Sequence, residues 1–174
     1  MSKHDKPIFL ADVDGVLNAF RHRPGPGQPQ YKWRRIQGYK IFFRPEWVEW
    51  VDGLVAVSDA YWASMWHSAA VDHFAPRTGI GTGIGRYIDF DFHHERALGE
   101  RTGGGVGPYK HPGIVATVGD RPFVWIDDDI AEWQHHWAAQ RNAGGIPTLL
   151  IQPDPAVGLT EEHVALAHQF LGGC

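Results

Sequence analysis

The chain has 174 residues, of which 43% are hydrophobic, and a formal net charge of −4. This length suits one compact domain with a substantial core, and no apolar run reaches the ~18 to 20 residues that a membrane-spanning helix needs. The polar start from Met1 to Lys6 and the single cysteine, Cys174, predict a soluble cytoplasmic protein without a signal peptide or an internal disulfide, and we expect no membrane partner.

Charge is distributed unevenly along the chain. Between Gly15 and Pro45 there is no Asp or Glu, whereas seven cationic residues occur there: Arg21, Arg23, Lys32, Arg34, Arg35, Lys40 and Arg44. Such a segment indicates a surface that meets a polyanion. The alternative is a solvated hairpin that carries cations on its exposed faces.

The N-terminal third of the sequence predicts a strand, a loop and a hairpin. Residues 8–13 form a short apolar run that ends at Asp14-Gly15, as expected of a buried parallel strand. Proline and glycine predict a loop over residues 23–30, and residues 31–43 predict a hairpin that turns at Gln37-Gly38.

The middle of the sequence predicts a helix that starts at Pro45, because apolar residues then recur at helical spacing at Trp47, Val48, Val51 and Leu54. A strand over residues 60–64 and a short helix over residues 67–74 follow. Residues 87–90 predict a brief strand between two glycine-rich loops, residues 78–86 and 102–107.

The C-terminal third predicts a helix after Pro112 and a strand over residues 122–126 that leads into Asp127, Asp128 and Asp129. Residues 130–142 predict a helix that stops at Gly144-Gly145. A strand over residues 147–151 and a helix that opens at Thr160 complete the chain.

Strands that alternate with helices predict an α/β fold of three layers, with a central parallel sheet and helices on both faces. We expect a single domain over residues 1–174, with a basic loop and flap hairpin at about residues 19–44 and no substantial cap domain. Ligands of such sheets collect at the carboxyl ends of the strands. That rule selects Asp12, Ser64 and Asp127, since each closes a predicted strand.

These strand ends supply the groups that phosphoryl transfer through an aspartyl phosphate needs. Asp12 is the predicted nucleophile, and Asp14 is placed to protonate the leaving oxygen. Ser64 and the amides of Met65 and Trp66 can bind phosphate oxygens, while Lys110, in a predicted loop before a helix, would neutralise charge.

Magnesium prefers oxygen ligands, and this pattern predicts a Mg²⁺ site at Asp12, the main-chain carbonyl of Asp14, and Asp127. Asp128 is expected to be a further ligand or to support one. The glycine-rich residues 79–85 lack the spacing of a dinucleotide loop, so we expect no nicotinamide or flavin cofactor.

These segments resemble, in order, the four motifs of the haloacid dehalogenase-like (HAD) superfamily. The first motif is similar to residues 12–16, the second to Ser64 after its apolar strand, the third to Lys110, and the fourth to residues 124–128. More narrowly, residues 61–66, 121–128 and 147–150 are similar to small HAD domains of actinobacteria and their phages that are associated with RNA repair proteins. The resemblance implies a Rossmann-like HAD fold, and the presence of Asp14 implies phosphate chemistry rather than dehalogenation.

The absence of a cap and the basic hairpin suggest that the substrate is a phosphorylated RNA or DNA end. Arg34 and Arg35 would bind backbone phosphates, and Trp33 or Trp66 would contact the substrate. Three alternatives remain: a small-metabolite phosphatase, a phosphotransferase with an acceptor other than water, and a non-catalytic nucleic-acid-binding module of the same fold.

Overall fold

Four parallel strands form the central sheet of the computed structural model, which describes residues 6–20, 30–90 and 107–174. The strands are β1 (Ile8–Ala11), β4 (Asp59–Trp62), β5 (Phe123–Ile126) and β6 (Thr148–Ile151). They lie in the order β4-β1-β5-β6. Because β1 pairs along its length with both β4 and β5, the strand that leads into Asp12 lies inside the sheet.

Side chains of each central strand alternate between two cores, one on each face of the sheet. On β1, Phe9 and Ala11 belong to one core, and Ile8 and Leu10 belong to the other. All four side chains are at most 1% exposed. This burial on both faces explains why the strand reads as a continuous apolar run rather than as an alternating one.

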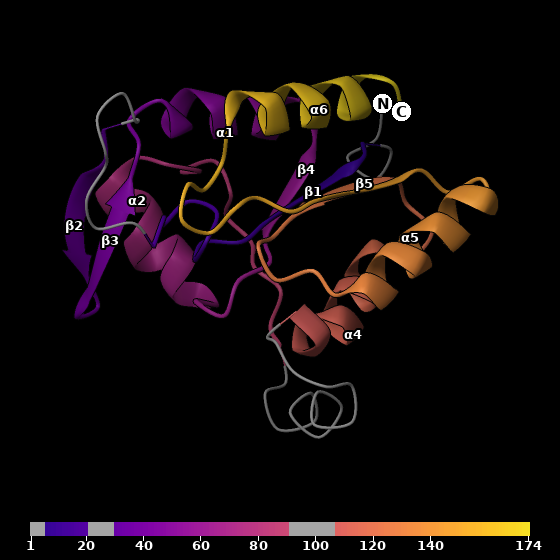
Figure 1. Cartoon of the computed structure of the whole chain (residues 1–174), viewed down its shortest axis with the longest axis horizontal. Helices are drawn as coiled ribbons and strands as arrows, with labels where there is room; N and C mark the ends of the chain where they lie inside the picture. Colours follow the sequence, from indigo (N-terminus) through magenta and orange to yellow (C-terminus); the bar gives the residue numbers. More distant parts are fainter. Residues whose placement is uncertain (1–5, 21–29, 91–106) are drawn as a thin grey trace.

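Helices cover both faces, which completes the predicted three layers (Figure 1). α1 (Trp47–Val57) and α6 (Glu161–Gly172) pack side by side on one face, and α4 (Gly107–Val118) and α5 (Glu132–Ala143) lie on the other. Trp47, Val51 and Leu54 form the buried stripe of α1, as their spacing predicted. No helix among the described residues is both long and apolar enough to cross a membrane.

The predicted hairpin is confirmed as β2 (Lys32–Ile36) and β3 (Tyr39–Phe43), which form a separate antiparallel pair beside the sheet (Figure 1). Gln37 and Gly38 make the turn with φ of 49° and 84°. Both values are positive, as a two-residue hairpin turn of this kind requires. Most of the preceding basic loop, with Arg21 and Arg23, lies outside the described residues.

Helical turns and coil fill the described part of the connection from β4 toward α4. A π-helical segment η1 (Ala70–Phe74) runs into α2 (Ala75–Thr78), close to the predicted short helix. The predicted strand over residues 87–90 is wrong, because only Tyr87 bridges to the sheet, at Trp62. The second predicted glycine-rich loop, residues 102–107, falls outside the described residues except for Gly107. No separate cap domain occurs among the residues that the structure describes.

The helix α4 begins earlier than the sequence predicts. It starts at Gly107 and carries Pro112 in its interior, so Lys110 lies on a helix and not in the loop that we expected. Lys110, Ile114 and Val118 follow one another at four-residue spacing and are at most 2% exposed. Packing of this buried stripe against the sheet outweighs the lost hydrogen bond at Pro112.

Candidate active site

Asp12 follows β1 directly and is tied into the sheet edge. Its main-chain N–H continues the pairing by donating to Ile126 O, and its Oδ1 accepts from the N–H of Val13 at 2.7 Å. The chain then turns sharply at Gly15, whose φ is +72°. This turn lets Asp12 and Asp14 face the same region while the apolar side chains of Val13 and Val16 enter the core.

Lys110 bridges the two strand ends from the helix α4. Its Nζ donates to Asp12 Oδ2 at 2.7 Å and to Asp127 Oδ2 at 2.6 Å. Burial alone would lower the pKa of Lys110, but the charges of Asp12 and Asp127 outweigh burial and raise the pKa above its usual value. The ammonium is therefore charged, and it joins two strand ends to a helix residue that lies 98 positions from Asp12 in the sequence.

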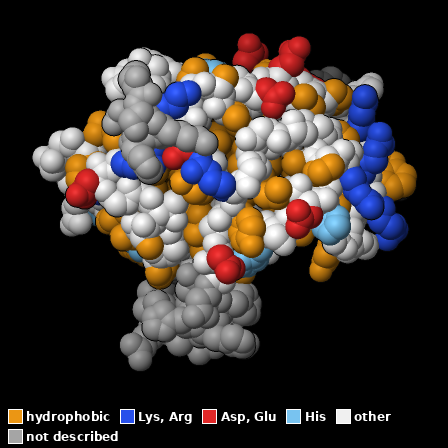
Figure 2. Space-filling model, turned by 180° about the vertical axis from the view of Figure 1, so that it is seen from behind, with side chains coloured by type: hydrophobic (Ala, Val, Ile, Leu, Met, Phe, Trp, Pro, Cys, Tyr) orange, Lys and Arg blue, Asp and Glu red, His pale blue; other side chains and the backbone are white. Residues whose placement is uncertain are grey.

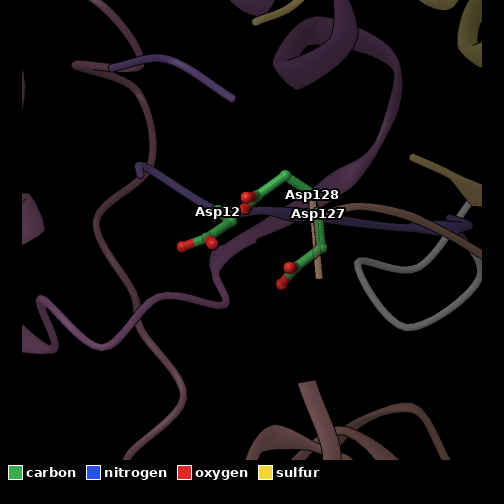
Figure 3. A group of neighbouring side chains, drawn as sticks. All are labelled: Asp12, Asp127 and Asp128. Atoms are coloured by element: carbon green, nitrogen blue, oxygen red, sulfur yellow. The ribbon is translucent and has the colours of Figure 1, made fainter. Parts of the chain in front are cut away.

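Asp127 and Asp128 are consecutive but have different surroundings (Figure 3). Asp127 is 0% exposed and accepts from Lys110 Nζ and Trp125 Nε1 on Oδ2, and from the N–H of Asp129 on Oδ1. Asp128 is half-buried and lines the cavity beside Asp12. Burial, and next the charge of Asp12, raise the pKa of Asp128 to about 6.

The three carboxylates make a group that fits a divalent cation. One oxygen from each of Asp12, Asp127 and Asp128 can be chosen so that all lie within 4.8 Å of one another. Both oxygens of Asp12 and both oxygens of Asp127 accept hydrogen bonds from the chain, and the carboxylate of Asp128 lies beside Asp12 (Figure 3). The donor set suits magnesium, and the predicted Asp127 belongs to it together with Asp12 and Asp128.

Asp14 is held by two side chains that the sequence reading did not connect with it. Asn18 Nδ2 donates to Asp14 Oδ1 at 2.6 Å, and Trp66 Nε1 donates to Oδ2 at 2.9 Å. Burial raises the pKa of Asp14, and these two hydrogen bonds oppose the rise. The sequence does contain a sign that Asn18 has a specific polar contact, because it is a short polar residue four positions after Asp14 in an otherwise apolar stretch.

Ser64 and Met65 lie where the second motif predicted them. They line a cavity of about 360 Å³ together with Asp12, Asp14, Lys110 and Asp128. Ser64 is 1% exposed, and its Oγ accepts a long hydrogen bond of 3.4 Å from the N–H of Trp66. The structure thus gathers the predicted nucleophile, acid, lysine and hydroxyl around one space.

A second cavity of about 600 Å³ adjoins the first and shares Asp14, Phe20 and Met65 with it. Its further walls include Trp66 and, from the hairpin, Tyr39 and Lys40. Tyr39 is 68% exposed and Phe20 is 52% exposed, so aromatic surface is open next to Asp14. The sequence predicts neither contact, because Phe20 follows the turn after Asp14 in irregular structure and the docking of the hairpin decides that Tyr39 reaches the site.

The predicted substrate residues Trp33, Arg34 and Arg35 lie elsewhere on the hairpin. With Lys32 they line a separate depression of about 450 Å³. Trp33 lies under Lys40, whose Nζ is 4.8 Å from the ring centroid. Basic side chains gather at the right edge of the molecule in Figure 2, the side on which the hairpin lies. The structure therefore separates this basic surface from the cavity at Asp12.

Another cavity, of about 460 Å³, lies at the opposite end of the strands, where β4 begins. Its one buried carboxylate, Asp59, is bound by both Arg86 and Arg121. These contacts satisfy its charge, and the cavity is remote from the carboxylates at the other edge of the sheet. We therefore assign the chemistry to the edge that carries Asp12.

A parallel sheet with an Asp-x-Asp turn after its central strand, a buried lysine and a second acidic pair defines a HAD-like hydrolase domain. A profile of the family described as "HAD domain in Swiss Army Knife RNA repair proteins" matches residues 8–164, and the chain belongs to this family. Membership supports a phosphatase of the HAD type. Comparisons with curated proteins and with solved structures gave no match.

Proposed function

We propose that this chain is a magnesium-dependent phosphatase that acts through a phosphoryl-Asp12 intermediate on phosphorylated nucleic-acid ends. The observation that carries the proposal is the position of Asp12. Its carboxylate lines a cavity of about 360 Å³ beside a buried lysine, a second carboxyl group and the Ser64 hydroxyl. This combination suits a carboxylate nucleophile, which attacks phosphorus while neighbouring groups offset the charge.

The reaction would take two steps. In the first, an oxygen of Asp12 attacks phosphorus, the bond to the leaving oxygen breaks, and Asp14 gives that oxygen its proton. In the second, water attacks the acyl phosphate, Asp14 takes a proton from this water, and Asp12 is freed with release of inorganic phosphate. Lys110 holds Asp12 in place, and Ser64 donates to a phosphate oxygen.

The carboxylates of Asp12, Asp127 and Asp128 would hold Mg²⁺ together with the main-chain carbonyl of Asp14. When bound, the cation reduces repulsion between the anionic nucleophile and the phosphate and polarises the phosphoryl group. Asp127 would also orient Lys110, whose Nζ donates to it. Burial, and next the charge of Asp12, raise the pKa of Asp128, and a cation between the two carboxylates would stabilise their ionised forms.

Three observations support nucleic-acid ends as substrates. The adjoining cavity offers the exposed rings of Phe20 and Tyr39, on which a base can stack, and the ammonium of Lys40 for a neighbouring phosphate. The exposed cations of β2 form a second basic surface on the same hairpin, separate from the cavity but next to Lys40, whose Nζ lies over the ring of Trp33 (Figure 2). The family description also refers to RNA repair proteins.

The test compares phosphate release from oligonucleotides with 3′ or 5′ phosphates and from small sugar phosphates, with Mg²⁺ or with EDTA. We expect oligonucleotides to be preferred, activity to need Mg²⁺, and Asp12→Asn to reduce release to the background rate while retaining the wild-type circular dichroism spectrum. Unchanged hydrolysis by Asp12→Asn would refute the nucleophile. Equal rates on sugar phosphates would refute the substrate class, and capture of the phosphoryl group by added nucleosides would indicate a phosphotransferase.

A further inference from the structure

The side chain of Asp14 is fixed at both oxygens. Asn18 Nδ2 lies 2.6 Å from Oδ1, and Trp66 Nε1 lies 2.9 Å from Oδ2. The two donors come from different parts of the chain, one four residues and the other 52 residues from Asp14. Rotation of the carboxyl group would break both hydrogen bonds, so its orientation is set partly within its own turn, by Asn18, and partly from outside it, by Trp66.

The indole of Trp66 is itself held in place. Its ring lies 6.0 Å from that of Tyr39 and 6.1 Å from that of Phe74, measured between centroids. Trp66 also belongs to the turn that carries Ser64, since its N–H faces Ser64 Oγ at 3.4 Å. One turn therefore delivers both a hydroxyl to the phosphate cavity and an N–H to Asp14.

We propose that Trp66 is a positioning residue that keeps Asp14 aimed at the leaving oxygen of the substrate. This inference rests on the proposed function and replaces the expectation that Trp66 simply contacts the substrate. As the bond from phosphorus to the leaving oxygen breaks and the bond to Asp12 forms, the proton of Asp14 moves to the leaving oxygen. Trp66 donates to Asp14 throughout and takes no part in bond making.

A pair of matched substrates can separate this role from a merely structural one. p-Nitrophenyl phosphate releases a stable phenolate that needs little protonation, whereas p-nitrobenzyl phosphate releases an alkoxide that needs a proton. Release of the organic product in a single turnover reports the first step alone. The single-turnover measurement uses the full chain with Mg²⁺ in excess over substrate, and KM comes from separate steady-state rates at substrate concentrations that span it.

In Trp66→Phe the ring contacts remain and the N–H donor is lost. We expect single-turnover release from p-nitrobenzyl phosphate to fall about tenfold or more, within the ~10²- to 10⁴-fold that general acid catalysis contributes. Release from p-nitrophenyl phosphate should change less than about threefold, and KM should be nearly unchanged for both substrates. Once Asp14→Asn has removed the acid, adding Trp66→Phe should have little further effect.

Trp47→Phe is the matched control, because Trp47 Nε1 also donates a hydrogen bond of 2.9 Å, but to Leu159 O in the core. It should lower stability without favouring one substrate over the other. If Trp66→Phe folds poorly, 3-benzothienylalanine at position 66 keeps the bicyclic shape and lacks only the donor.

Each outcome of this experiment has a distinct meaning. Equal loss on both substrates, or no loss on either, would overturn the positioning role and leave the phosphatase proposal standing. Failure of the wild-type protein to release product from these two substrates and phosphate from phosphorylated oligonucleotides would instead overturn the proposed function, and the role of Trp66 with it.

Discussion

Replacing Lys110 by methionine should be among the most damaging single substitutions in this protein. The side chain is 2% exposed, and its Nζ is the shared partner of Asp12 and Asp127, whose side chains are 6% and 0% exposed. Methionine retains the apolar stem but leaves two buried carboxylates facing each other. Breaking a buried ion pair at one partner costs about 3–5 kcal/mol, out of a typical total stability of roughly 5–15 kcal/mol.

The loss should depend on pH. Burial raises the pKa of Asp127, and the charge of Lys110 opposes that rise. Without Lys110 the pKa of Asp127 should rise further. A carboxyl group whose pKa is raised on folding destabilises the folded state while it is ionised, and this penalty disappears as the pH falls through the raised value. The stability difference between wild type and Lys110→Met should therefore be larger at pH 7.5 than at pH 5.

Urea unfolding followed by tryptophan fluorescence can measure both effects, because the chain has eight tryptophans. Adding Asp127→Asn to Lys110→Met removes one stranded charge and should restore part of the lost stability. Lys40→Met is the control, since Lys40 is exposed and its loss should cost at most about 0.5 kcal/mol. A loss below about 1 kcal/mol at pH 7.5, or one that is the same at both pH values, would refute the reasoning.

Two further substitutions test the turn at Gly15 and the packing between α4 and α5. Gly15→Ala should abolish phosphatase activity and lower stability by more than about 2 kcal/mol, because its Cβ would lie 2.1 Å from Asp128 Cγ at a φ of +72°. A soluble, active Gly15→Ala protein in phosphate-release and urea assays would contradict this. His111 lies between Trp133 and Trp137 with both ring centroids at 4.5 Å, and burial lowers its pKa to about 4. The imidazole of His111 therefore binds a proton more readily in the unfolded chain than in the folded one. Wild type should lose roughly 1–2 kcal/mol of stability as the pH falls from about 6.5 to 4, a figure reduced for the partial exposure of the ring. His111→Phe should lack that loss, and equal urea midpoint shifts in both proteins over this range would exclude His111 as its source.

The parts of the site that follow strands were predictable from sequence, because a strand end is encoded locally. The apolar runs before Asp12, Ser64 and Asp127 are short and end at polar residues, so their position at one sheet edge follows from the parallel order. The positions of Lys110 and Pro112 were misread for the opposite reason. Proline disfavours the interior of a helix, so the local sequence predicts that the helix starts at Pro112. Lys110 instead lies on α4, where it contacts Asp12 and Asp127 at the ends of two strands that are distant in sequence.

The contacts of the hairpin could not be predicted, because they depend on how it docks. Its sequence indicates strands and a turn, but cations and aromatics occur on both strands. Docking brings Tyr39 and Lys40 to the cavity at Asp14 and leaves Trp33 to Arg35 on a separate surface. The hydrogen bond from Trp66 to Asp14 is equally a product of tertiary structure, since no spacing rule relates two residues 52 positions apart.

The order of the strands also determines when the site can form during synthesis. β1 pairs with β5, whose first residue, Phe123, lies opposite Ile8, so one side of β1 stays unpaired until most of the chain has left the ribosome. Lys110 and Asp127 are added late as well, and pairing over such separations is slow because a long loop must close first. A nascent chain truncated before β5 therefore lacks Asp127 and Asp128 and leaves one edge of the apolar strand β1 unpaired, and an unpaired edge of this kind favours aggregation.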